Sequence, residues 1–113
     1  MTRFVLLQHD HPTLHWDLML EAGDVLRTWR LPSVPIAGAV LPAVRTSDHR
    51  LVYLDYEGPV SGNRGQVMRW DGGEFEWLEQ SEFVLVVRLC GARLEGLLRL
   101  EQQENSSWLA AFG

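Results

Sequence analysis

The sequence predicts a mainly β fold, a small, closed or nearly closed antiparallel β-barrel with little helix. Short apolar or alternating segments recur along the whole chain, about eight to ten of them, each bounded by Gly, Pro, Asn or Asp turn signals. A chain of 113 residues that is 46% hydrophobic can bury one core but is too short for two. We therefore expect a single domain over residues 1–113.

The first half of the chain alternates between strand and turn patterns. A turn over residues 22–24 should return one strand onto the previous one as a hairpin. Prolines and a glycine mark an irregular crossing over residues 32–42. The strands expected in this half are residues 3–8, 14–21, 25–31, 43–46 and 51–56.

The second half begins with a glycine-rich loop over residues 58–65. A turn is expected at 71–73 and a polar hairpin loop at 102–107, and residues 76–80 also fit a helical turn. The strands expected in this half are residues 66–70, 74–78, 83–89, 93–100 and 108–112.

Composition limits the function classes. A net charge of −5 argues against a wide basic surface for nonspecific nucleic-acid binding, and all ten basic residues are arginine. No stretch approaches the roughly 18 apolar residues of a membrane span, and the amino terminus lacks a signal-peptide pattern. We therefore expect a cytoplasmic protein that does not associate with a membrane. The single cysteine, Cys90, excludes an intrachain disulfide and is expected to be buried; most of the five tryptophans are expected in the core.

The segment 9–21 concentrates side chains that bind metals. It holds three of the four histidines of the chain. Because side chains alternate along a strand, His15 and Asp17 should share one face with Met19 and Glu21, while apolar residues fill the other. His9, at the end of the preceding strand, could complete a His/His/Asp set for a divalent metal with open positions. The same residues also fit a hydrogen-bonded strand end without a metal.

Ordered motifs extend this pattern over nearly the whole chain. The first has the form H-D-x-x-x-L-H-x-D-x-x-L-E, and later blocks read T-W-R-L-P, D-H-R-L-V-Y-L-D-Y-E-G, G-Q-V-M-R-W-D-G-G and L-C-G-A-R-L-E-G, followed by a late W-L. In this order the motifs resemble the 3′-phosphoesterase domain family of bacterial DNA ligase D. The chain would be a divergent, stand-alone member of it.

The resemblance implies a metal-dependent β-barrel enzyme of DNA repair that heals the 3′ ends of DNA or DNA–RNA primer-templates. It would remove a terminal ribonucleoside and then a 3′-phosphate, with manganese the first candidate cofactor and Zn²⁺ or Co²⁺ as alternatives. The metal residues would be His9, His15 and Asp17, and two further active-site residues would be His49 and Tyr53. Any ligase or polymerase that works with it would be a separate protein acting in trans.

The chain departs from the family pattern at basic positions. Met19 and Ser33 stand where the family has an arginine and a lysine, and Leu41 falls on a further basic position. Such cations stabilise the charge on a phosphoryl group in the transition state. The candidate substitutes near the motifs are Arg30, Arg45 and Arg50, while Asp10 is expected to orient a neighbouring histidine and His11 to be exposed.

Two functional hypotheses remain at this point. The intact set of five site residues favours a metal-dependent phosphoesterase, the hypothesis we prefer, with hydrolysis of a different phosphoester as a variant of it. The altered positions at Met19 and Ser33, together with the acidic charge, favour a catalytically degenerate barrel that binds a metal, a nucleic-acid end or a protein partner without turnover.

Overall fold

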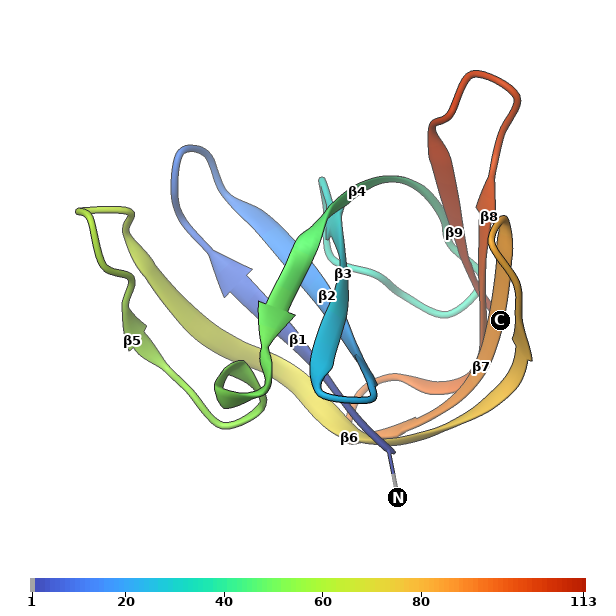
Figure 1. The fold of residues 1–113 in the computed structure, drawn as a ribbon, viewed down its shortest axis with the longest axis horizontal. Helices are drawn as coiled ribbons and strands as arrows, with labels where there is room; N and C mark the ends of the chain where they lie inside the picture. Colours follow the sequence, from blue (N-terminus) through green and yellow to red (C-terminus); the bar gives the residue numbers. More distant parts are fainter. Residues whose placement is uncertain (1) are drawn as a thin grey trace.

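The structure, a computed structural model, describes residues 2–113, so the predicted domain 1–113 includes one residue, Met1, that lies outside the described residues. These described residues form nine strands and one short 3₁₀ helix (Figure 1). They are β1 (Thr2–His9), β2 (His15–Ala22), β3 (Val25–Leu31), β4 (Val40–Arg50), η1 (Leu51–Leu54), β5 (Gly58–Pro59), β6 (Gln66–Gln80), β7 (Val84–Gly91), β8 (Glu95–Gln102) and β9 (Trp108–Phe112).

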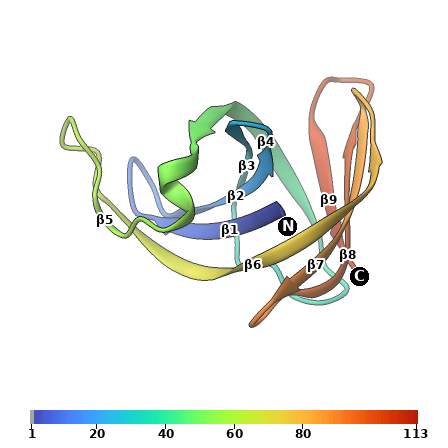
Figure 2. The ribbon, with the colours of Figure 1, turned by 60° about the horizontal axis from the view of Figure 1, so that its bottom comes forward.

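Eight of the strands close into an antiparallel barrel, which confirms the predicted fold class. Neighbouring strands follow the order β1-β2-β3-β4-β9-β8-β7-β6, and β6 pairs back onto β1. The short β5 adds to the edge of β6. The long β6 sweeps under the molecule and belongs to both sides of the barrel (Figure 2).

The barrel interior is filled by alternate residues of the strands, as the pleat requires. On β2, Trp16, Leu18 and Leu20 point into this core, as their spacing predicts. Three of the five tryptophans are buried there and the other two, Trp70 and Trp77, pack against it. Cys90 follows the inward Leu89 on β7 and is therefore exposed, so its predicted burial is wrong.

The outer face of β1 and β2 is also covered, which the sequence pattern does not indicate. A second apolar cluster joins Val5, Leu7 and Met19 of this face to Leu54 of η1. Its cover comes from the bend of β4, which pairs with β9 over Val40–Ala43 and then crosses to β3 and ends at η1 (Figure 1). The barrel wall thus has apolar side chains on both faces at this point.

Two expectations for this bend are wrong. The crossing predicted for 32–42 ends at Val40, and β4 continues through the turn-like residues 47–50, because β3 offers hydrogen-bonding partners up to Arg50. The strand predicted for 51–56 is instead η1, whose i, i+3 spacing places Leu51 and Leu54 against the second cluster.

A predicted turn at 71–73 and a helical turn at 76–80 are absent from the described chain, since β6 runs through both with two bulges. Gly73 serves close packing: a Cβ there would collide with the carbonyl of Cys90 on β7. Asp71 is buried, and its carboxylate accepts hydrogen bonds from the backbone N–H groups of Ala92, Arg93 and Leu94 at 2.7–3.2 Å. The Asp71 carboxylate thus holds the turn between β7 and β8.

Within residues 2–113, no helix has the length and apolar character needed to cross a membrane.

The Asp71→Asn variant should lower the free energy of unfolding by about 2–3 kcal/mol, because a buried carboxylate loses charge-assisted hydrogen bonds and an amide N–H then faces the donors of the turn. Urea unfolding measures this loss. Asp24→Asn, in the exposed β2–β3 turn, is the matched control and should change stability by less than about 0.5 kcal/mol. Equal losses in the two variants would contradict the role of Asp71.

Candidate metal centre and adjoining cavity

Three ligand-type side chains converge where β1 ends and β2 begins. The antiparallel register pairs His9 directly with His15, and Asp17 lies two residues further on the same face. One ligand atom of each residue lies within 4.8 Å of the other two. His15 and Asp17 are buried and His9 is half-buried, so the cluster is largely withdrawn from water.

Backbone carbonyls fix which nitrogen of each histidine is free. The Nε2 atom of His9 lies 2.8 Å from the carbonyl oxygen of Arg64, and Nδ1 of His15 lies 2.8 Å from that of Thr13. A carbonyl only accepts, so these nitrogens carry the protons. The other nitrogens, Nδ1 of His9 and Nε2 of His15, lie 3.6 and 3.2 Å from Oδ2 of Asp17.

This donor set fits a divalent cation. Two imidazole nitrogens and a carboxylate oxygen lie close together, and such a set of ligand atoms is stabilised by positive charge placed between them. Each histidine is also held by a backbone carbonyl through its second nitrogen, an arrangement typical of metal-binding histidines.

A cavity of about 430 Å³ opens beside this cluster. His9 and Asp17 form part of its lining. Further lining residues come from the β1–β2 connection, β2, β3, the end of β4, η1, the β5–β6 loop and β6. His49 and Tyr53 line it together, with ring centroids 5.6 Å apart. We call it the histidine cavity. The structure therefore brings the five residues singled out by the sequence to one place.

Only one of the three arginines proposed from the sequence lines the histidine cavity. Arg30 pairs across the ladder with Asp17, and its Nε lies 3.9 Å from Oδ1 of that carboxylate. Arg45 instead packs over the ring of Trp29 at 4.8 Å and binds Asp48 at 3.1 Å. Arg50 lines a neighbouring hollow.

The Arg45 side chain lies on the face of β4 that carries the contact with the core residue Trp29. Burial, and then the charge of Arg45, lower the pKa of Arg27, whose guanidinium lies over the same Trp29 ring at 5.5 Å. These two arginines therefore cover the tryptophan.

Arg64 and Thr46 line the histidine cavity and were missed by the sequence reasoning. Arg64 is the sole cation in the loop predicted for 58–65, and this charge is the signal that could have found it. Its guanidinium is held by Ser61, with Nε 2.7 Å from the carbonyl oxygen. Among the described residues, the Thr46 hydroxyl is buried without a hydrogen-bond partner.

The altered family positions have different surroundings. Met19 lines the histidine cavity and is 1% exposed, so an apolar thioether occupies that wall. Leu41 packs against the barrel core, and Ser33 is exposed in the β3–β4 connection. Of the three positions, Met19 alone bears on the chemistry of the cavity.

Asp10 acts on the histidines through a loop. Its Oδ1 accepts a hydrogen bond from the backbone N–H of Gln66 at 2.8 Å, which ties the β1–β2 connection to the residues around Arg64. The carbonyl of Arg64 in turn holds His9. His11 is half-buried and lines the histidine cavity, outside the three-residue cluster.

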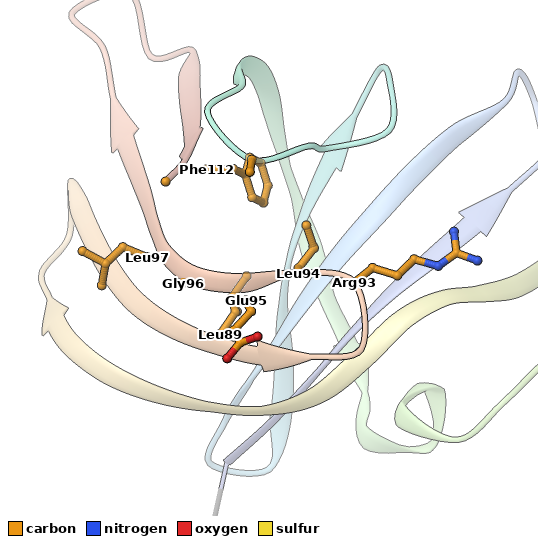
Figure 3. A pocket seen from close by; sticks show the side chains of 9 residues that line it. Leu89, Arg93, Leu94, Glu95, Gly96, Leu97 and Phe112 are labelled. Atoms are coloured by element: carbon orange, nitrogen blue, oxygen red, sulfur yellow. The ribbon is translucent and has the colours of Figure 1, made fainter.

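A hollow on the opposite part of the barrel is a poorer candidate. It lies between the β7–β8 hairpin and the end of β9, has a volume of about 30 Å³, and is lined by Leu89, Leu94 and Phe112 (Figure 3). The side chain of Arg93 is directed away from these residues (Figure 3). The hollow is small and mainly apolar.

The fold and the site thus define an antiparallel β-barrel with a candidate metal cluster beside a cavity that has cationic walls. Residues 7–102 match the family described as DNA Ligase D 3′-phosphoesterase domain. The chain belongs to this family.

Relatives of known name are consistent with this membership. The chain is 30% identical over 124 residues to the multifunctional non-homologous end joining protein LigD of Mycolicibacterium smegmatis, covering 96% of the chain and 16% of that protein. It is 30% identical to the multifunctional non-homologous end joining DNA repair protein LigD of Mycobacterium tuberculosis. It is 32% identical, over 84 residues, to the multifunctional non-homologous end joining protein LigD of Pseudomonas aeruginosa. These alignments cover 95% and 70% of the chain, but 15% and 10% of the relatives.

The Gly65→Ala variant tests the loop that carries Arg64. Gly65 has a φ of +72°, and a Cβ there would collide with the Asp10 carboxylate and lie 2.8 Å from Cβ of His11. We expect a loss of about 2–4 kcal/mol in the free energy of unfolding, measured with urea.

Gly38→Ala is the matched control, since its φ is +83° with nothing within 4 Å of the added Cβ. This variant should lose only about 1 kcal/mol of the free energy of unfolding, which is the cost of placing alanine in the left-handed backbone conformation. Equal losses in both variants would mean that the contact with Asp10 does not hold the loop.

Proposed function

We propose that the protein is a metal-dependent phosphoesterase that heals the 3′ ends of DNA or DNA–RNA primer-templates during DNA repair. The observation that carries this proposal is the convergence of His9, His15 and Asp17 beside a cavity lined by His49 and Arg30. Family membership and relatives named for DNA end joining support it.

The proposed reaction removes a terminal ribonucleoside and then a 3′-phosphate. In the second step, a water oxygen bonds to phosphorus, the bond from phosphorus to the 3′ oxygen breaks, and that oxygen takes a proton. The products are inorganic phosphate and a 3′-hydroxyl. A polymerase or a ligase requires such an end, so we propose enzymes of these classes as its consumers.

His9, through Nδ1, His15, through Nε2, and Asp17 would hold the metal. Two nitrogens and a carboxylate oxygen suit Mn²⁺, which we propose first, and also Zn²⁺ or Co²⁺. When bound, the ion would neutralise phosphoryl oxygens and lower the pKa of a coordinated water.

His49 is proposed as the residue that contacts the phosphate or transfers a proton. Its Nδ1 lies 3.0 Å from the carbonyl oxygen of Ser47, which leaves Nε2 for the substrate. The Tyr53 ring packs against this imidazole and would position it. The unpartnered hydroxyl of Thr46 could donate a hydrogen bond to a phosphoryl oxygen.

Arg30 and Arg64 would replace the basic residues that the family has elsewhere. Both line the histidine cavity, and guanidinium groups suit planar recognition of phosphate. The second candidate function is a barrel that binds a nucleic-acid end without turnover, and Met19 in the cavity wall is the observation that favours it.

Metal uptake should depend on the cluster. Titration calorimetry with MnCl₂ should give one ion per wild-type chain, while His15→Ala and Asp17→Ala should each abolish this uptake because each removes a ligand from an incomplete shell. The control His11→Ala changes a cavity histidine outside the cluster and should keep the stoichiometry. Unchanged uptake in both ligand variants would show that the ligands are assigned wrongly.

Turnover should depend on His49 and Arg30. With Mn²⁺ and a primer-template that ends in one ribonucleotide or in a 3′-phosphate, the wild type should yield a 3′-hydroxyl product. His49→Ala and Arg30→Gln should each lower kcat on the order of a hundredfold. Arg99→Gln, an exposed charge change on β8, should have no effect. A folded wild type that gives no product with any divalent metal would support the non-catalytic alternative.

A further inference from the structure

A second hollow adjoins the histidine cavity. It has a volume of about 240 Å³, and we call it the tyrosine groove. Its lining residues are Arg50, Val52, Tyr53, Tyr56, Pro59, Val60 and Ser61. Tyr53 and Val60 also line the histidine cavity, so the two hollows share a wall. The groove is therefore a candidate site for the part of a ligand that projects beyond the cavity.

Aromatic rings lead from the cavity into the groove. The centroids of His49 and Tyr53 are 5.6 Å apart, and those of Tyr53 and Tyr56 are 5.9 Å apart, both in edge-to-face contact. The Tyr56 hydroxyl donates a hydrogen bond to the carbonyl oxygen of Pro59, which anchors the ring to β5. Fixed aromatic rings beside an open hollow suit the stacking of a nucleobase.

Positive charge borders the groove although the chain carries a net charge of −5. Among residues 2–113, neither Arg50 nor Arg64 has a carboxylate oxygen within 4.0 Å. Nearby carboxylates are already engaged: Asp55 binds Arg3 at 2.7 Å, and Asp48 binds Arg45 at 3.1 Å. Glu57 accepts a hydrogen bond from the backbone N–H of Arg69 at 2.8 Å. The rim therefore favours an anion.

We propose that the tyrosine groove binds the nucleotide that precedes the 3′-terminal one. Its base lies against Tyr53 and Tyr56, and its phosphate lies at Arg50. The terminal phosphate then lies in the histidine cavity between Arg30 and Arg64. This assignment rests on the proposed function, because it sets the direction of the strand relative to the metal cluster.

Binding without turnover tests the groove separately from the enzyme. The probe is a 5′-fluorescein single-stranded DNA 12-mer with a 3′-hydroxyl, followed by fluorescence anisotropy over a series of NaCl concentrations. Loss of one phosphate contact should make the slope of log K against log[NaCl] shallower by about 0.7 in Arg50→Gln. Arg99→Gln is the control of equal charge change and should leave the slope unchanged.

A second pair of variants tests the contribution of the Tyr56 ring to DNA binding. Tyr56→Leu should weaken binding about fivefold or more, because a stacking ring is lost. Tyr56→Phe keeps the ring without its anchoring hydroxyl and should lose less affinity than Tyr56→Leu, which separates stacking from anchoring; equal losses in the two variants would contradict stacking on Tyr56. Melting temperatures identify a variant that fails to fold, and Arg50→Gln changes an exposed side chain that does not support the core.

Three outcomes would overturn the proposal: a wild type that does not bind the 12-mer, a slope unchanged in Arg50→Gln, or equal changes in Arg50→Gln and Arg99→Gln. Thymidine 3′-phosphate has no preceding nucleotide, so hydrolysis of it should be unchanged in Arg50→Gln while KM for a 3′-phosphorylated 12-mer rises. If the wild type binds the 12-mer as described but hydrolyses neither substrate, the proposed function fails and the groove stands.

Discussion

The register between β1 and β2 is the constraint on which the rest of the site depends. It sets His9 opposite His15 and places both on the outer face with Asp17. The same register points Trp16, Leu18 and Leu20 into the barrel core. A slip of one residue would move the polar side chains into the core and the apolar ones outward, so burial of the core enforces the geometry of the histidines.

The outer face becomes a site only because a second layer covers part of it. The bend of β4 and the turn of η1 bring His49 and Tyr53 over β1 and β2, while Leu54 seals the neighbouring apolar cluster. The wall strands are packed on both faces, which limits their freedom to move. Rigid strands hold the three candidate ligands, and β4, η1 and the connections supply most of the remaining cavity lining.

Local sequence patterns predicted the features that depend on strand periodicity. Alternation along residues 14–21 placed His15 and Asp17 on one face, and the turn at 22–24 matches the β2–β3 hairpin. The patterns failed where a distant partner decides the structure. Gly72 and Gly73 read as a turn, but their lack of a side chain leaves room for the Arg69 guanidinium of the same strand and for the backbone of Cys90 on β7. Residues 47–50 also read as a turn and are held in β4 by β3.

The three candidate phosphate-binding arginines show the same limit of local sequence patterns. Nearness in sequence suggested three substitutes for the missing family cations, yet a β-strand sends neighbouring side chains to opposite faces. Arg30 reaches the histidine cavity, whereas Arg45 faces Trp29 in the barrel. Arg64 lies 55 positions from His9 and is brought to it by the pairing of β1 with β6, which no local pattern shows.

Arg64 contributes to the site through both its backbone and its side chain. The orientation of His9 and the charge of the cavity wall therefore depend on the same residue. Its backbone carbonyl orients His9, and its side chain lines the wall where a substrate anion would lie. Any lengthening or shortening of the β5–β6 loop would shift both at once. Redesign of this barrel for other substrates is therefore better directed at Arg30 on β3, whose side chain can be exchanged without altering a loop that holds an imidazole.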